Sequence, residues 1–353
     1  MSVNAVQKKR FDQLDVRNPF FDSLRVDYKG FDNWFKKKSR EKAQVLVTYD
    51  DDELEGFLYL KDEDEGDDSI IPRFPKKRRL KIGTFKINAH GTILGQRFMT
   101  IILRKMIRED FSESYVTFFK KQLGICNLVT KFGYICHGQK DNGELVYVKD
   151  LKHKDNIYLD FPRVNLMNSK KALLAIKPEY HTQMFPDSKL NTESEYIIED
   201  LSHTNTIEKV YISGVRSVNS LQKGDLLVMY RTKEKDSPSP AEYNSVATSI
   251  CTVVEVKNIK DFSSEEDYLM YTRQGSVYDD IELKSFYKNR KLTDRYCIKM
   301  LYNFPLNKRI IRQKLADDVG LNRSARWAYM NLSEEQFNQI LKVGEVNEGF
   351  IIN

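Results

Sequence analysis

The chain has little of what marks a secreted, metal-binding or membrane-spanning protein. Only four of its 353 residues are cysteine, and none forms a C-x-x-C pair. No cluster of histidines stands near them at zinc-ligand spacing, so we expect reduced thiols and no metal. No apolar run approaches the ~20 residues that a membrane helix needs. The mean hydropathy of -0.56 fits a soluble protein, and we expect no membrane partner.

The opening residues and the overall charge also exclude several classes. The first 15 residues, MSVNAVQKKRFDQLD, contain no apolar stretch of the signal-peptide kind, so we expect a cytoplasmic protein. The formal net charge is +6, and this modest excess permits a nucleic-acid partner without requiring one. With 41% hydrophobic residues the chain can build a core, and its length fits about two domains.

The first half of the chain alternates between strand-like and helix-like patterns. Helices are expected at Phe31–Lys42, Leu94–Arg108 and Phe119–Lys131, and strands at Gln44–Tyr49, Gly56–Lys61, Leu80–Ile87, Ser114–Phe118 and Leu145–Lys149. The acidic residues between the first two strands are expected to form a hairpin turn. Strands that alternate with helices after an antiparallel start predict an α/β fold with a mixed sheet.

A strongly charged segment interrupts this pattern. Residues 61–69 (KDEDEGDDS) are nearly all acidic or small, and two prolines and the basic run Lys76–Arg79 follow. Like-charge blocks beside prolines are typical of a solvated loop. The alternative is that the basic run contacts phosphate.

The second half is richer in strands. Strands are expected at Lys170–Lys177, Lys209–Val215, Asp225–Arg231, Ser245–Lys257 and Arg295–Tyr302, with short helices or loops between them. These strands predict a β-rich second domain, a small barrel. We therefore expect one domain over residues 1–155 and another over 160–353.

The most informative stretch is LKIGTFKINAHGTILGQRFMTIILRKMIRED. A strand ends near Ile87, a short loop contains Gly91, and a helix begins at about Leu94. The first backbone N–H groups of a helix have no intrahelical partner, and with the helix dipole they attract anions. Gly95 carries no side chain, so a phosphate could approach the backbone closely.

Together with the downstream segments SESYVTFF, FGYI and GELVYVK, this stretch resembles the GNAT acetyltransferase family over residues 18–150. The resemblance implies acetyl-CoA as cofactor. It implies that the helix start binds the pyrophosphate and that the preceding strand faces the pantetheine. The residues so implied are Ile82, Gly83, Thr84, Phe85, His90, Gly91, Leu94, Gly95, Gln96 and Arg97. Ile93 stands where the family has its first loop glycine, which is a departure from the pattern, although Gly91 could supply flexibility.

The catalytic residues are less well marked by this resemblance. The family often has a tyrosine acid a few residues before a Gly–aromatic pair, here Gly133–Tyr134, and Val129 occupies that place. Tyr134 and Tyr147 are the main candidate substitutes, and Thr130 and Cys126 are further ones. Glu55 is the candidate for a water-linked base. Each has a structural alternative: the tyrosines as core or sheet-face aromatics, Cys126 as a buried small residue, and Glu55 as a turn carboxylate.

Two segments of the second half, KKALLAIKPEYHTQMFP and SLQKGDLLVMYR, resemble the PUA-like superfamily, which includes ASCH domains. The resemblance implies RNA or a modified base as partner. Lys177, Arg231, Arg323 and Arg326 could then contact phosphates, and Tyr180, Tyr230 and Trp327 could stack on bases. The alternative is that these aromatics fill the barrel or cover the domain junction.

These observations predict an acetyl-CoA-dependent N-acetyltransferase whose second domain presents an amine on or with RNA, such as tRNA. A toxin-like acetylator of aminoacyl-tRNA, as in a toxin–antitoxin system, is one form of this hypothesis. A second hypothesis is a non-catalytic nucleic-acid-binding or regulatory protein that retains the fold. A third is a protein or small-molecule acetyltransferase whose second domain only supports a partner or a homodimer.

Overall fold

The computed structural model describes residues 6–50, 52–88, 94–185, 207–235, 238 and 240–352. The described chain divides into two compact units. Unit 1 extends as far as Lys152 and unit 2 begins at His153. The two domains that we expect from the sequence, over residues 1–155 and 160–353, remain a prediction. Each unit is described by itself.

Unit 1 is built on an eight-stranded mixed sheet in the order β1-β2-β3-β5-β6-β8-β7-β4. Its strands are β1 Gln7–Arg10, β2 Gln44–Asp50, β3 Glu53–Glu63, β4 Ile70–Ile71, β5 Arg79–Ile87, β6 Glu113–Phe118, β7 Ile135–Lys140 and β8 Leu145–Asp150. Of these neighbours, β5 and β6 run parallel and the others antiparallel. The predicted mixed α/β sheet is confirmed.

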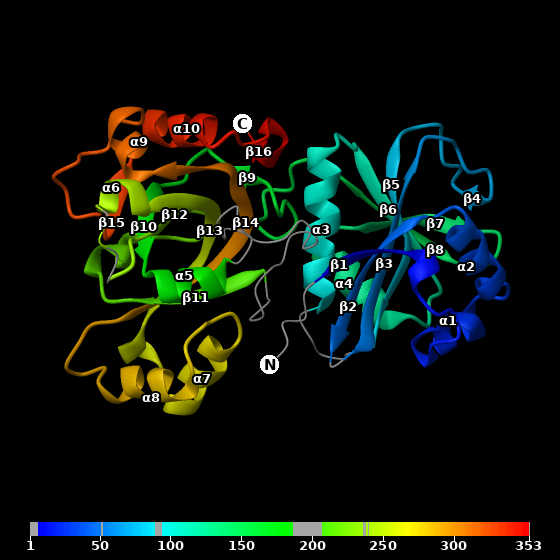
Figure 1. Ribbon diagram of the computed structural model, residues 1–353, viewed down its shortest axis with the longest axis horizontal. Coiled ribbons are helices and arrows are strands. Elements are labelled where there is room, and N and C mark those ends of the chain that lie inside the picture. Colours follow the sequence, from blue (N-terminus) through cyan, green and yellow to red (C-terminus); the bar gives the residue numbers. More distant parts are fainter. Residues whose placement is uncertain are drawn as a thin grey trace. The chain divides into compact units, whose positions relative to one another are not determined.

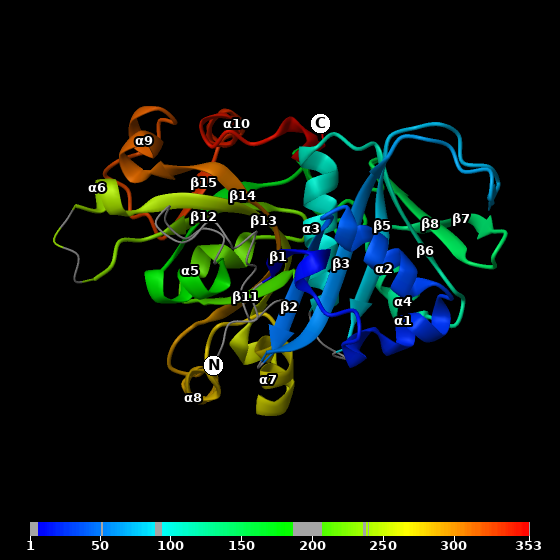
Figure 2. The same ribbon diagram turned by 45° about the vertical axis from the view of Figure 1, so that its right-hand side comes forward.

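Helices cover both faces of this sheet. The α-helices are α1 Asp22–Asp27, α2 Phe31–Arg40, α3 Leu94–Arg108 and α4 Leu123–Lys131, and the short 3-10 helices η1 Phe11–Gln13 and η2 Pro19–Phe21 precede α1. Helix α3 lies on one side of the strands and α1 and α2 lie on the other (Figures 1 and 2). The bounds of α3 are those predicted from its apolar spacing. Its length and long buried face make it the parallel crossover between β5 and β6.

An aromatic cluster fixes α1 and α2 to their face of the sheet. Phe11, Phe21, Phe35 and Phe57 belong to one group of buried residues in this layer. The ring of Phe11 meets those of Phe35 and Phe57 edge-on, at centroid separations of 5.0 and 5.5 Å. Such edge-to-face pairs stabilise beyond the area they bury. The cluster therefore holds the helix layer that forms one wall of the candidate site.

The charged segment between β3 and β5 is a loop whose basic residues are all paired. Lys76 contacts Glu65, Lys77 and Arg79 both contact Glu113, and Arg78 contacts Asp62. The guanidinium of Arg78 also packs on the ring of Phe111. These contacts favour the surface-loop interpretation over phosphate binding.

Unit 2 is built on a six-stranded sheet in the order β11-β14-β13-β12-β10-β15. Its strands are β10 Lys171–Ile176, β11 Glu208–Ser213, β12 Leu226–Arg231, β13 Val246–Asn258, β14 Tyr296–Ile311 and β15 Tyr329–Leu332, and β9 Val164–Asn165 pairs separately with β16 Ile351–Ile352. Among the described residues β11 and β15 do not pair with each other. Closure into a barrel therefore remains a prediction.

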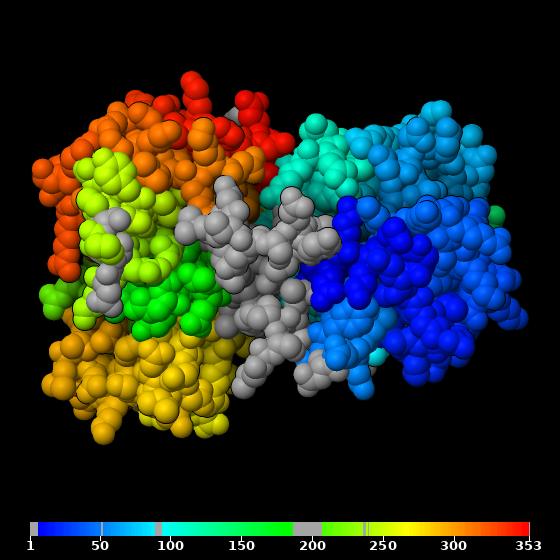
Figure 3. Space-filling view, viewed as in Figure 1, coloured from blue at the N-terminus to red at the C-terminus, as the bar shows by residue number. Residues whose placement is uncertain are grey.

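Short helices join and flank these strands. They are α5 Pro178–Met184, α6 Ala241–Asn244, α7 Glu265–Arg273, α8 Asp280–Lys288, α9 Arg312–Asp317, α10 Glu334–Val343 and the 3-10 helices η4 Arg216–Ser220, η5 Ile259–Asp261 and η6 Glu348–Phe350. Ser264 and Asp279 cap α7 and α8 through their side chains, as their residue types favour. These two helices are grouped together, in gold, on the surface in Figure 3.

None of the helices formed by the described residues is both long and apolar enough to cross a bilayer. No group of histidine, cysteine, aspartate and glutamate side chains among these residues could hold a metal ion.

Candidate active site

The central feature of unit 1 is a split between its two parallel strands. β5 and β6 pair over three positions, and the last pair joins Ile82 to Val116. β5 then continues to Ile87, and β6 continues to Phe118, with no further pairing between them in the described chain. In an antiparallel pair alternate residues turn their backbone groups away from the partner strand. Part of the backbone of residues 83–87 therefore faces the opening rather than β3.

A cavity of about 930 Å³ lies at this split. Its lining includes residues 81–87 of β5, Gly95 and Gln96 of α3, residues 116–118 of β6, and Gly124, Ile125 and Leu128 of α4. Residues of α1, α2, β3 and the β7–β8 hairpin form the rest of the wall. This volume lies in the range of small-molecule and cofactor sites. The start of α3 thus opens into a cleft between splayed strands.

The residues predicted to hold acetyl-CoA are largely brought together here. Ile82, Gly83, Thr84, Phe85, Gly95 and Gln96 all line the cavity. Leu94 and Arg97 belong to the same first turn of α3 but do not line it, and Arg97 is buried. His90 and Gly91 lie outside the described residues. The assignment of this set to a cofactor remains a proposal.

The structure gives Gly95 an additional reason to lack a side chain. A Cβ atom there would come within 3.0 Å of a methyl group of Leu128 on α4. Glycine therefore allows the first turn of α3 to pack closely on α4. Gly124 differs, because a Cβ atom at that position would meet nothing within 4 Å, although the residue lines the cavity.

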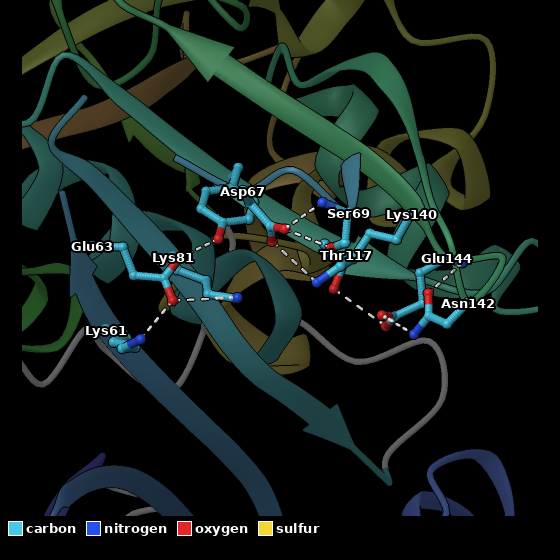
Figure 4. A network of polar contacts seen from close by, with 10 residues as sticks. Lys61, Glu63, Asp67, Ser69, Lys81, Thr117, Lys140, Asn142 and Glu144 are labelled. Carbon is cyan, nitrogen blue, oxygen red and sulfur yellow. Dashed lines mark hydrogen bonds and ion pairs between the residues drawn. The ribbon is translucent and has the colours of Figure 1, made fainter. Parts of the chain in front are cut away.

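Figure 4 shows a row of polar and ionisable side chains, and those of it that line the cavity are Lys61, Glu63, Lys81, Thr117, Lys140 and Glu144. On β3, Glu63 Oε1 accepts from the Nζ atoms of Lys61 at 2.7 Å and Lys81 at 3.4 Å, and the hydroxyl of Tyr115 donates to Oε2. Burial raises the pKa of Glu63, but these hydrogen bonds outweigh burial and hold the pKa below its usual value. Glu63 is therefore an ionised carboxylate whose oxygens are already engaged.

The other end of the row is a carboxylate with neutral partners. Glu144, in the β7–β8 hairpin, is buried and lines the cavity. Its Oε1 accepts from the hydroxyl of Thr117 at 3.2 Å and its Oε2 from the amide of Asn142 at 2.9 Å. Thr117 is the first residue of β6 beyond the last β5–β6 pair. Glu144 thus stands where the strands separate.

Tyr28, just beyond α1, places a phenol near this carboxylate. Its hydroxyl donates to Gln122 Oε1 at 3.4 Å. Burial raises the pKa of Tyr28 well above its ordinary value, and the charge of Glu144 raises it further. Tyr28 is therefore protonated across the physiological range and can act as a hydrogen-bond donor.

The catalytic residues predicted from the sequence lie elsewhere. Tyr134 is buried and its hydroxyl donates to Ser114 at 2.9 Å, while Tyr147 contacts the Sγ atom of Cys126 at 3.6 Å. Since Tyr147 pairs with Val116 across β6 and β8, it shares the α4 face of the sheet rather than the face of Thr117. Glu55 also stands outside the cavity lining. Catalytic roles for these three residues remain predictions that their placement does not favour.

Glu144 and Tyr28 were not identified from the sequence. Glu144 belongs to the GELVYVK segment and Tyr28 to VDYKG, and neither segment carries a motif beyond strand and helix-end patterns. Their proximity depends on the register of β6 with β8 and on where α1 ends. A carboxylate beside a hairpin glycine, Gly143, is the one local signal, and it is common in turns.

Unit 2 has a cavity of its own, of about 510 Å³. Its lining includes the cations Lys177, Lys233, Arg312 and Arg326, and no aspartate or glutamate is among the described residues that line it. The guanidinium of Arg312 lies 4.5 Å from the ring centroid of Trp327. The ring of Tyr230 lies 5.3 Å from the same ring. The cavity therefore combines positive charge with two packed aromatic rings that are tilted against each other and largely buried.

Four residues predicted to contact nucleic acid line this cavity, namely Lys177, Tyr230, Arg326 and Trp327. Arg231 instead pairs with Glu234, and the Tyr180 hydroxyl donates to Glu282 at 2.9 Å. Arg323 pairs with Glu242 and Asp317. Arg312, which the sequence analysis did not single out, occupies the central place beside Trp327.

Comparisons with known proteins give structural likeness only. No protein-family description and no curated protein matches the chain. It is similar to a mutant of the Zymomonas mobilis protein ZmASCH, with 10% identity over 50% of this chain and 97% of that one and a TM-score of 0.34. It is also similar to the Thermoplasma acidophilum PaiA N-acetyltransferase in complex with coenzyme A, with 12% identity over 42% and 99% and a TM-score of 0.31. For the Campylobacter jejuni N-acetyltransferase PseH the identity is 14% over 42% and 99%, with a TM-score of 0.28.

Proposed function

We propose that unit 1 is an acetyl-CoA-dependent N-acetyltransferase. The observation that carries this proposal is the cavity at the β5–β6 split, into which the first turn of α3 opens. The exposed backbone of residues 83–87 offers hydrogen bonds to an extended amide-bearing chain, as a sheet edge does. The positive end of the α3 dipole favours the diphosphate at the end of such a chain. The residues present therefore fit acetyl-CoA.

Acetyl-CoA supplies the activated acetyl group when it is bound. The chain's own contribution begins with Glu144, whose carboxylate has only neutral donors and can accept a proton from an incoming ammonium group. Tyr28, which lies near Glu144, keeps its proton and can donate a hydrogen bond toward negative charge that develops in the cleft.

The cavity wall offers a sharp test of cofactor binding. Gly124 lines the cavity and has open space where a side chain would grow, so Gly124→Glu adds a carboxylate to the cleft without a clash. Asn127→Glu makes a matched control, because it adds the same charge three residues along α4 on an exposed position. Acetyl-CoA binding is measured by isothermal calorimetry and by the shift in melting temperature.

Wild type and Asn127→Glu are expected to bind acetyl-CoA, and Gly124→Glu is expected to lose at least about tenfold in affinity from charge repulsion and filled volume. Absence of binding by the wild-type chain would overturn the proposal. Equal binding by all three proteins would remove the cofactor from this cleft.

We further propose that unit 2 presents RNA, such as a tRNA, to the enzyme. The supporting observation is the cavity that combines four cations with Trp327 and Tyr230. The Nε atom of Arg312 is buried without a hydrogen-bond partner among the described residues, which leaves a donor for a ligand to satisfy, while Ser245 and Arg312 lie near the Tyr230 hydroxyl. The alternative is an acetyltransferase of small molecules or proteins in which unit 2 is structural.

Salt dependence separates these alternatives. A phosphate-contacting site loses affinity steeply as salt rises, and each lost contact reduces the slope by about one unit. Arg326→Ala should weaken tRNA binding and reduce the slope, whereas Lys314→Ala, an exposed change on α9, should leave both unchanged. RNA binding that ignores salt, or that is identical in all three proteins, contradicts the RNA proposal.

A further inference from the structure

The two ends of the row of polar and ionisable side chains are unequal. At one end Lys61 and Lys81 share a single carboxylate oxygen, Glu63 Oε1. The other oxygen of Glu63 is occupied by the Tyr115 hydroxyl. Two cations against one anion leave about one unit of positive charge at this end, and all three charged residues line the cavity.

At the opposite end the excess charge is negative. Glu144 receives hydrogen bonds from Thr117 and Asn142, which are neutral side chains. No cation within ion-pair distance of Glu144 is found in the part of the chain that the structure describes. Between the two ends Lys140 and Asp67 form an ion pair at 3.2 Å, so their charges cancel. The Lys61–Lys81 pair and the Glu144 carboxylate thus lie at opposite ends of the row of side chains (Figure 4).

We infer that the acceptor is an amine that also carries an acidic group, with its ammonium at Glu144 and its acid at the Lys61–Lys81 pair. This inference rests on the proposed acetyltransferase function and specifies its substrate class. A carboxylate or a phosphate satisfies the lysine pair equally, since both are anions that accept from ammonium groups. A free amino acid supplies the first, and an aminoacyl end of RNA supplies the second.

The aromatic wall beside the lysine pair adds a second feature of the acceptor. Trp34 and Tyr59 line the cavity, and their rings meet at a centroid separation of 5.8 Å. Tyr59 lies on the same strand and the same face as Lys61, two residues away. An acceptor seated on the lysines therefore meets apolar ring surface. Acceptors with two amines and no acid, such as polyamines, would place a cation against the lysine pair and be repelled.

Matched pairs of acceptors test the acid group directly. CoA release from acetyl-CoA is measured for leucine against isopentylamine and for phenylalanine against 2-phenylethylamine, which differ only in the carboxylate. A second arm compares 3′-O-aminoacyl-adenosine 5′-phosphate with the corresponding 3′-O-aminoacyl-adenosine, which lacks only the phosphate. Binding of the same amines without acetyl-CoA is followed by ligand-observed NMR, so that recognition is scored apart from turnover.

The expected result is a preference for the acid-bearing member of at least about tenfold in kcat/KM, with the same order in binding. The arm of the experiment that shows this preference identifies whether the lysine pair binds a carboxylate or a phosphate. Lys81→Met should reduce this preference toward unity through KM, because one of the two cations is removed. Lys36→Met, an exposed change on α2 outside the cavity, should retain it.

Two results would overturn the inference. One is an equal or greater rate with the acid-free amines in both arms. The other is an acid preference that Lys81→Met leaves intact. Failure of the proposed function gives a different result: acetyl-CoA does not bind, and no amine causes release of CoA. The NMR experiment still measures whether the acid-bearing amines bind better than the acid-free ones.

Discussion

Lys61 on β3 is the direct cross-strand partner of Lys81 on β5. Like charges placed opposite each other destabilise a sheet unless a counter-charge joins them. Glu63, two residues along β3, supplies that charge by accepting from both lysines. The pairing of β3 with β5 beside the cavity therefore depends on an ionised carboxylate.

This dependence predicts an acid-sensitive unit 1. The folded-state pKa of Glu63 is below its usual value of 4.5, so its stabilisation is present above that value and lost as pH falls through the lower folded value. Glu63→Gln should cost about 1 kcal/mol at pH 7, since the pair is part-exposed. It should also flatten the decline of the unfolding free energy below about pH 4.5. Urea unfolding at several pH values measures this, and an unchanged acid limb in the variant would contradict it.

Glu144 is expected to govern the rate rather than cofactor affinity. Glu144→Gln removes the proton acceptor and keeps the shape, so kcat should fall by about 100- to 10,000-fold while acetyl-CoA affinity stays within about twofold. Asp141→Asn changes an exposed carboxyl in the same hairpin and serves as control. Steady-state kinetics with calorimetry separate the two effects. A loss confined to acetyl-CoA binding would assign Glu144 to the cofactor site.

Tyr28 is expected to act in its protonated form. Because burial and Glu144 raise its pKa, ionisation of Tyr28 should produce no fall in kcat up to about pH 10. Tyr28→Phe should lower kcat by about tenfold at every pH in this range. A descending limb below about pH 10 in the wild type that disappears in Tyr28→Phe would show that the phenol titrates earlier than its environment allows.

Phe11 is expected to be a main contributor to the stability of unit 1. It is fully buried and its ring meets those of Trp34, Phe35, Phe57 and Tyr59. Phe11→Ala should lower the unfolding free energy by about 3–5 kcal/mol, and Phe11→Leu by clearly less. Fluorescence of Trp34 in a Trp327→Phe background reports unit 1 alone, because these are the two tryptophans of the chain. If both substitutions lowered the unfolding free energy equally, the loss of side-chain volume at Phe11 would not be its cause.

The parts of the fold that the sequence predicted are those with strong apolar periodicity. Helix α3 is an example, because the apolar residues whose helical spacing predicted it are all buried, namely Phe98, Ile101, Ile102, Met106 and Ile107. β1 was missed because its residues, QKKR, are exposed or half-buried and it pairs with one neighbour, β2. Nothing in such a segment separates a strand from a loop before the register is known.

Strand β14 shows how a local rule can shorten a prediction. The sequence predicted it only as far as Tyr302, and Pro305 argues against continuing a central strand. In the structure β14 runs on to Ile311, while its pairing with β11 ends at Leu301. Beyond Leu301, β14 pairs only with β13 among the described strands. The missing N–H group of Pro305 therefore costs no hydrogen bond to a second neighbouring strand. Whether a residue faces a neighbouring strand or an open edge depends on the tertiary structure and cannot be read from the local sequence.

The candidate site follows the same division. The strand–turn–helix that predicted the cofactor cleft is local, and six of its named residues line the cavity. Glu144 and Tyr28 meet only because β8 is seated beside β6 and α1 ends near Gln122. The predicted tyrosines do not line this cavity, because Tyr147 is engaged by Phe118 and by Cys126 of α4, while Tyr134 is buried against Ser114.

Because β5 and β6 pair over a short stretch, the middle of this sheet lacks part of its backbone hydrogen bonding. A ligand bound there would supply hydrogen bonds that a neighbouring strand would otherwise make. Amide protons in residues 83–87 that now face the opening should then exchange with solvent quickly in the free protein and slowly once an extended amide chain is bound. Hydrogen exchange measured residue by residue along this stretch would therefore show whether the ligand is bound. It would also show which backbone amides the ligand pairs with, and it would do so without the acetyl-transfer reaction.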